Sequence, residues 1–204
     1  MAYVSLLGDS VIDNKIYVNP GELSVKEHLE EQSGYVFNQI AVDGHTTNDV
    51  IEYQIDKINN KLTTHKVLSI GGNDLLGHLG FLKNNIELTA IEILEQAVVL
   101  LAPIKNRYRT IVQNLSQQNP NLLLCTVYEG NLVGDSFYSD VAFASKAMVS
   151  MFNDIVFNTA FTFNTDVLDL RNIFTTPEDY ANPIEPSHTG GKKLSKEILE
   201  WVNK

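Results

Sequence analysis

The sequence predicts a three-layer α/β/α fold in which a five-stranded parallel sheet carries helices on both faces. Short apolar runs, typical of buried strands, alternate along the chain with longer stretches whose apolar residues recur at helical spacing. Strands separated by helices are typical of parallel sheets that are covered on both faces. The expected strand order is 2-1-3-4-5, the flavodoxin-like doubly wound arrangement.

Each element has its own signal in the sequence. The apolar runs predict strands at residues 2–7, 35–42, 66–71, 121–128 and 165–170. Ser24 and Glu27 have the spacing of a capping box and predict the start of the first helix. Further helices are expected at about 47–60, 89–118 and 139–163, the second of these kinked or broken near Pro103. The last helix follows Thr189, where Leu194 and Ile198 lie on one face.

Size and composition indicate one globular domain spanning residues 1–204. With 44% hydrophobic residues, the 204-residue chain can bury a full core.

A net charge of −10 argues against nucleic acid as a partner. No apolar run is long enough to span a bilayer, and no secretory leader precedes the first strand, so we expect a cytoplasmic protein. The single cysteine, Cys125, lies in an apolar run and is interpreted as a buried packing residue.

Small polar residues follow each of the first three predicted strands. Gly8-Asp9-Ser10 follows the first, a segment with Gly44 follows the second, and Gly71-Gly72-Asn73-Asp74 follows the third. In a doubly wound sheet, ligands bind beyond the carboxyl ends of strands 1 and 3, where the strand order reverses. These segments are therefore expected to meet at one site.

Ser10 is the candidate nucleophile of that site. A serine nucleophile needs a base for its proton, a group that orients the base, and donors for the developing oxyanion. The backbone N–H groups of Ser10 and Gly44 and the Asn73 amide are the candidate donors.

His188 is the preferred base among the histidines. His28 is expected on a helix surface, and His65 precedes the third strand, at the opposite end of the sheet. His45 and His78 lie near the right edge but have no acid at an obvious orienting spacing. His188 has Glu185 three residues before it, and the long connection from the fifth strand can reach Ser10.

These blocks, in this order, resemble the SGNH (GDSL-type) hydrolases: Gly-Asp-Ser, a later glycine, Gly-x-Asn-Asp, and an acid three residues before a histidine. The resemblance runs from Gly8 to His188 and implies a serine esterase or lipase acting on carboxylic esters or thioesters. Separately, no set of His, Cys and carboxylate residues has metal-ligand spacing, so neither a metal nor a cofactor is expected. It implies Ser10 as nucleophile and oxyanion donor, Gly44 and Asn73 as further donors, and His188 as base.

The sequence departs from the family pattern at two positions. Val11 stands where the family has leucine, a mild change. Glu185 stands where the family has aspartate before the histidine. The longer glutamate either orients His188 by another approach or points elsewhere, leaving a backbone carbonyl to orient the imidazole.

Other interpretations remain open. Gly-Asp-Ser occurs again at 134–136, where the family pattern does not surround it, and this copy is interpreted as a loop. One alternative is a catalytically silent binding module for an acyl or sugar ligand or a protein partner. Another is a nucleotide or flavin binder, although no Gly-x-Gly-x-x-Gly follows the first strand.

The pocket wall is expected from segments 11–20, 75–86 and 129–140, which carry Tyr17, Leu76, Phe81, Phe137 and Tyr138.

Overall fold

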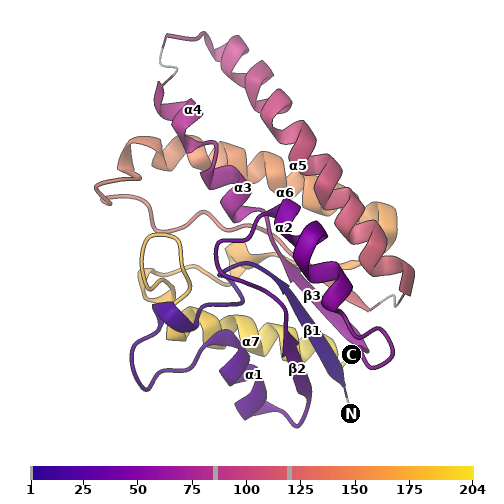
Figure 1. Cartoon of the computed structure of the whole chain (residues 1–204). Coiled ribbons are helices and arrows are strands. Elements are labelled where there is room, and N and C mark those ends of the chain that lie inside the picture. Colours follow the sequence, from indigo (N-terminus) through magenta and orange to yellow (C-terminus); the bar gives the residue numbers. More distant parts are fainter. Residues whose placement is uncertain (1, 85–86, 119–120) are drawn as a thin grey trace.

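The structure is a computed structural model that describes residues 2–84, 87–118 and 121–204. Among these residues, five parallel strands form one sheet in the order β2-β1-β3-β4-β5, which confirms the predicted topology (Figure 1). The strands are β1 (Tyr3–Gly8), β2 (Val36–Gln39), β3 (His65–Ser69), β4 (Leu122–Cys125) and β5 (Asp166–Leu168). The strand order reverses at the β1–β3 pair, so the segments that follow β1 and β3 emerge side by side.

Helices cover both faces of this sheet. The α-helices are α1 (Val25–Gln32), α2 (Thr47–Asp49), α3 (Gly72–Leu76), α4 (Leu79–Asn84), α5 (Ala90–Gln118), α6 (Ala142–Phe163) and α7 (His188–Val202). The Ser24–Glu27 capping box begins α1 as predicted. The α5 helix runs through Pro103 as one element, so a break there is not observed.

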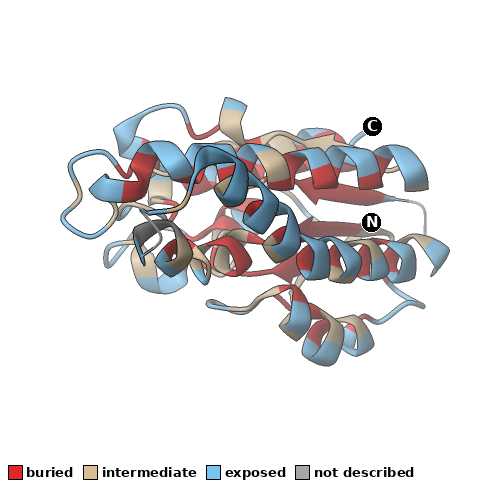
Figure 2. Ribbon diagram, turned by 90° about the horizontal axis from the view of Figure 1, so that it is seen from above, coloured by how far each residue is buried: buried red, intermediate tan, exposed pale blue. Residues whose placement is uncertain are grey.

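The alternation of side chains along the strands divides the core into two layers. Leu7 of β1 and Leu68 of β3 point to one face, where they pack with residues of α5 and α6 such as Ile104 and Phe152. Leu6 points to the opposite face and packs against α1 and α7. Successive strand residues face opposite ways, so each strand contributes to both layers. Figure 2 shows the buried residues concentrated on the strands and the inner sides of the helices.

The segment expected as one helix at 47–60 is irregular. It consists of α2, a π-helical stretch η2 (Val50–Gln54) and a 3₁₀ turn η3 (Ile55–Lys57). Gln54, the last residue of the π-helical stretch, is fully buried and forms hydrogen bonds with both backbone groups of Gly8. The Gly8 N–H donates to Gln54 Oε1 at 2.8 Å, and Gln54 Nε2 donates to the Gly8 carbonyl at 2.7 Å. The irregular helix therefore supplies the side chain that fixes the end of β1, just before Ser10.

Candidate active site

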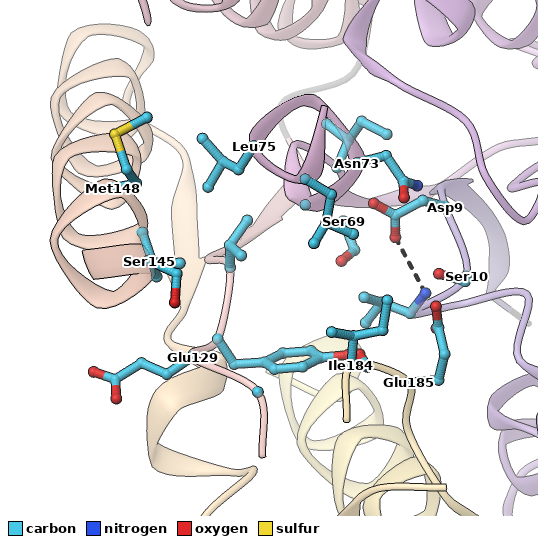
Figure 3. A pocket seen from close by; sticks show the side chains of 18 of the residues that line it. Asp9, Ser10, Ser69, Asn73, Leu75, Glu129, Ser145, Met148, Ile184 and Glu185 are labelled. Atoms are coloured by element: carbon cyan, nitrogen blue, oxygen red, sulfur yellow. Dashed lines mark hydrogen bonds between the residues drawn. The ribbon is translucent and has the colours of Figure 1, made fainter. Parts of the chain in front are cut away.

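Ser10 lies on a tight turn directly after β1. The turn depends on Gly8, whose φ of +130° is accessible to glycine and whose missing Cβ would lie 1.7 Å from the Ser69 carbonyl oxygen. The Asp9 carboxylate closes the turn by accepting a hydrogen bond from the Val11 N–H at 3.1 Å (Figure 3). Ser10 itself is only 6% exposed. The serine is thus held rigidly at the carboxyl end of a buried strand.

The candidate oxyanion donors come from the ends of β1, β2 and β3. Neither the Ser10 nor the Gly44 backbone N–H has a hydrogen-bond acceptor among the described residues. The Asn73 side chain, on α3, donates one N–H to the His45 carbonyl at 3.0 Å, which ties the segment after β3 to the segment after β2. A second amide N–H of Asn73 remains for a ligand. Of these residues, Ser10 and Asn73 line the main cavity, whereas Gly44 does not line it.

Asp74 fixes the segment that carries Asn73. Its buried carboxylate accepts hydrogen bonds from the Thr47 N–H at 2.8 Å and the Thr47 hydroxyl at 2.7 Å. The Arg107 guanidinium of α5 pairs with the same carboxylate at 3.2 Å. The start of α2 and the start of α3 are therefore locked together beside the serine.

A cavity opens in front of Ser10, enclosing about 840 Å³ of empty space that includes part of the solvent at its mouth. Its walls come from α3, α4, α6 and the segments after β4 and β5 (Figure 3). The apolar wall residues include Leu75, Leu76, Leu79, Val127, Leu132, Met148, Val149 and Ile184. Polar groups gather at one end of the cavity, where Asp9, Ser10 and Asn73 meet Glu185. A largely apolar group therefore fits in the cavity with its polar end against the serine.

The predicted cavity walls are only partly correct. Of the five side chains named for them, Leu76 lines the cavity, while Tyr17, Phe81, Phe137 and Tyr138 do not. Residues 85–86 of the expected 75–86 wall lie outside the described residues. The contribution of α6 was missed, because its apolar residues carry the same pattern whether they face the core or a cavity.

Glu185 meets Ser10 at the polar end of the cavity. Both side chains line this end of the cavity, and they point toward one another in Figure 3. Oε2 of the carboxylate is buried and has no hydrogen-bond partner among the described residues. Burial raises the pKa of Glu185 to about 6, with the charge of Asp43 adding to the shift and the Ser10 hydroxyl opposing it.

His188 is not brought to Ser10, and this corrects the expected Ser10–His188–Glu185 arrangement. Its ring points toward α1: Nδ1 lies 3.0 Å from the Leu23 backbone nitrogen and 3.2 Å from Nε2 of His28. His188 does not line the cavity. The reason is local, because Ser187 caps α7 by accepting from the Gly190 N–H, and His188 is already the first residue of that helix. Glu185 precedes the cap, in the segment that runs past Ser10.

His28 also differs from its expected surface position. It is 2% exposed and stacks on His188 with ring centroids 4.6 Å apart. Burial and the neighbouring His188 lower its pKa. The two rings therefore belong to the α1–α7 packing, away from the serine.

Asp9 is a site residue that the sequence reasoning passed over. Burial raises its pKa to about 8, and the negative charges of Glu185 and Asp74 add to the shift. Asp9 is consequently neutral at pH 7. The available signal was its position, an acid immediately before the serine at the end of a buried strand.

Two further sequence expectations concern metal and thiol chemistry. Within the described residues, no group of His, Cys, Asp and Glu side chains is arranged to hold a metal ion. Cys125 is buried in β4, as predicted, and burial raises the pKa of its thiol to about 12.

None of the helices in the described parts of the chain is long and apolar enough to cross a membrane.

Comparison with known proteins identifies the fold. No family model and no curated protein sequence matches the chain. An extracellular lipase from Streptomyces rimosus superposes with a TM-score of 0.70 at 17% identity, covering 100% of this chain and 99% of that one. A G-D-S-L family lipolytic protein from Veillonella parvula gives 0.72 at 14% identity, covering 100% of both chains. This chain therefore has the SGNH hydrolase fold.

A third similar structure bears on the histidine. It is an acetylxylan esterase from Geobacillus stearothermophilus, a catalytic mutant in which a histidine is replaced by alanine. It superposes with a TM-score of 0.71 at 14% identity and covers 100% of this chain and 94% of that one. In the present chain, a carboxylate rather than an imidazole contacts the serine.

Proposed function

We propose that this protein hydrolyses carboxylic esters through an acyl-enzyme on Ser10. The observation that carries the proposal is the setting of the Ser10 hydroxyl. It lies at the polar end of an apolar cavity that Asn73 also lines, and it faces the buried Glu185 side chain (Figure 3). The similarity of the fold to lipases and esterases supports the same reaction class.

The reaction follows the usual course of a serine hydrolase. Ser10 Oγ attacks the acyl carbon while its proton passes to a neighbouring base, and the carbonyl oxygen becomes an oxyanion. The N–H groups of Ser10 and Gly44 and the amide of Asn73 are the proposed donors to that oxyanion. The alcohol leaves with the proton, and water then releases the acid from Ser10. The apolar walls of the cavity suit the hydrocarbon part of the acyl group.

The test is covalent labelling followed by turnover. A fluorophosphonate probe should label the protein at one site, and mass spectrometry of the peptides should locate the adduct on Ser10. A panel of p-nitrophenyl esters and thioesters of increasing acyl length should then identify the preferred substrate. Labelling at another residue, or no labelling with no turnover of any ester, would refute the proposal.

Asn73→Ala provides a second test of the same proposal. Loss of one oxyanion donor should lower kcat by about 10²- to 10³-fold with a smaller change in KM, because the bond strengthens only in the transition state. Steady-state kinetics on the best ester measure the effect. An unchanged kcat would remove Asn73 from the oxyanion site.

The position of His188 favours one alternative, a binding module that holds an acyl ligand without cleaving it. The imidazole expected as base lies against α1, so this alternative needs no change in the fold. It predicts that fatty acids or unreactive ester analogues bind in the cavity while Ser10 resists the fluorophosphonate probe.

A further inference from the structure

Glu185 occupies the place where a proton acceptor for Ser10 is needed. A base must lie within hydrogen-bond reach of the hydroxyl whose proton it takes. The Glu185 carboxylate faces the Ser10 side chain in the cavity (Figure 3), and no histidine ring is hydrogen-bonded to Ser10 among the described residues. His78 does line the cavity, but its ring makes no hydrogen bond to the serine in the described parts of the chain.

We infer that the Glu185 carboxylate, rather than a histidine, is the general base that accepts the proton of the Ser10 hydroxyl. This inference rests on the proposed ester hydrolysis at Ser10. It assigns Glu185 the role that the sequence resemblance implies for His188.

The backbone around Glu185 holds the carboxylate in place. The Asn182 side-chain oxygen accepts from the Glu185 N–H at 3.0 Å, and the Glu185 carbonyl accepts from the Ala181 N–H at 2.9 Å. A bridge between Tyr180 and Pro186 closes this loop. The loop backbone is thus fixed on both sides of Glu185, which limits how far its side chain can move from the serine.

The groups around Glu185 are acidic or phenolic. Asp9 after β1, Asp43 after β2, Tyr17 of the 3₁₀ turn η1 (Lys15–Tyr17), Tyr128 after β4 and Tyr138 all interact electrostatically with it. Tyr17 donates its hydroxyl proton to Asp43 at 3.0 Å. Asp9 and Glu185 are close enough to disfavour ionisation of both, and Asp9 has the higher pKa. Glu185 is therefore the carboxylate that is ionised near neutral pH.

Each step balances with Glu185 as the only base. In acylation, the Ser10 Oγ–acyl bond forms and the hydroxyl proton moves to the carboxylate. When the ester bond breaks, the leaving alkoxide takes that proton from the carboxylic acid. In deacylation, a water oxygen bonds the acyl carbon and its proton moves to Glu185. The Ser10 oxygen then leaves and regains the proton.

The deciding experiment compares Glu185→Gln with His188→Asn. Glutamine has the shape of glutamate but cannot accept the proton, so kcat/KM should fall by about 10²- to 10⁴-fold. His188→Asn should retain kcat/KM within about threefold, since its ring lies outside the cavity. Glu185→Asp keeps a carboxylate and should recover part of the activity. Circular dichroism and thermal unfolding check that each variant is folded.

The pH profile of kcat/KM gives a signature that a structural role would not produce. Activity should rise with pH through a midpoint of about 6, as the carboxyl loses its proton. The midpoint should change little on warming, because carboxyl ionisation is nearly athermal, whereas the pKa of an imidazole falls. His188→Asn should keep this profile. Glu185→Gln should remove the rise from its residual activity.

The outcomes separate this inference from the proposed function. If the fluorophosphonate probe labels Ser10 but Glu185→Gln keeps wild-type kcat/KM, the inference is overturned and the ester hydrolase remains. Loss of activity in His188→Asn or His78→Asn, with a midpoint that falls on warming, would transfer the role of base to that histidine. If the wild-type protein neither reacts with the probe nor turns over esters, the proposed function itself fails.

Discussion

The chain contains the tripeptide Gly-Asp-Ser twice, and the two copies have different structures. At 8–10, it ends a central strand, and both Asp9 and Ser10 are buried. At 134–136, it lies in a loop where Asp135 accepts from the backbone N–H groups of Phe137 and Tyr138, at 2.7 and 2.9 Å, and Ser136 is exposed. In both copies the glycine has a positive φ and the aspartate caps the following turn. The two copies share a positive-φ glycine and an aspartate cap, whereas burial depends on the place of each copy in the fold.

Burial makes the first copy chemically distinct. The fold that buries this copy also places a second carboxyl, that of Glu185, near the serine, although Glu185 is about 175 residues away in the chain. Burial also raises the pKa of Asp9 to about 8. The second copy has a hydroxyl, but Ser136 does not line the cavity that Ser10, Asn73 and Glu185 share. Each position of the tripeptide thus offers a matched pair of variants.

The serine pair should show the largest effect. Ser10→Ala should lower kcat/KM at least about a thousandfold, because the nucleophile is lost. Ser136→Ala should leave kcat/KM within about twofold, since its hydroxyl is exposed. Hydrolysis of the best p-nitrophenyl ester measures both. Equal activity of the two variants would show that Ser10 is not the nucleophile.

The glycine pair should differ in stability. Gly8→Ala places a Cβ 1.7 Å from the Ser69 carbonyl oxygen, a clash with the backbone of a central strand, and should cost on the order of 4 kcal/mol or prevent folding. A Cβ at Gly134 meets no described atom within 4 Å, so Gly134→Ala should cost only about 1 to 2 kcal/mol for its positive φ. Urea unfolding measures both, and similar midpoints would contradict the packing argument.

The aspartate pair should differ in the slope of stability against pH. Asp9 has a raised pKa when folded, so its stabilising contribution is complete below about pH 4 and declines up to about pH 8. The decline is about 1.4 kcal/mol per pH unit. Asp9→Asn should remove this part of the slope, while Asp135→Asn should leave the slope unchanged. Identical slopes in wild type and Asp9→Asn, from urea unfolding across this range, would mean that Asp9 ionises normally.

Much of the fold could be predicted because its signals are local. Alternation of strands and helices predicts the layers, the Ser24–Glu27 spacing predicts the start of α1, and the strand order follows from the doubly wound pattern. The proposed nucleophile and the proposed oxyanion donors follow strand ends, whose positions are set by those same patterns. The irregular helix at 47–57 was missed because Gln54 is placed by contact with Gly8, a residue far away in the chain.

The sequence by itself determined which chemical groups stand at the strand ends, since strand length and turn geometry depend on neighbouring residues. Only the tertiary structure decided which group meets the serine. Glu185 and His188 are three residues apart, and spacing alone favours the imidazole. The cap at Ser187 turns the chain between them, so that the carboxylate faces the cavity and the imidazole faces α1. Which of these two side chains faces the serine therefore depends on where the last helix begins and what it packs against.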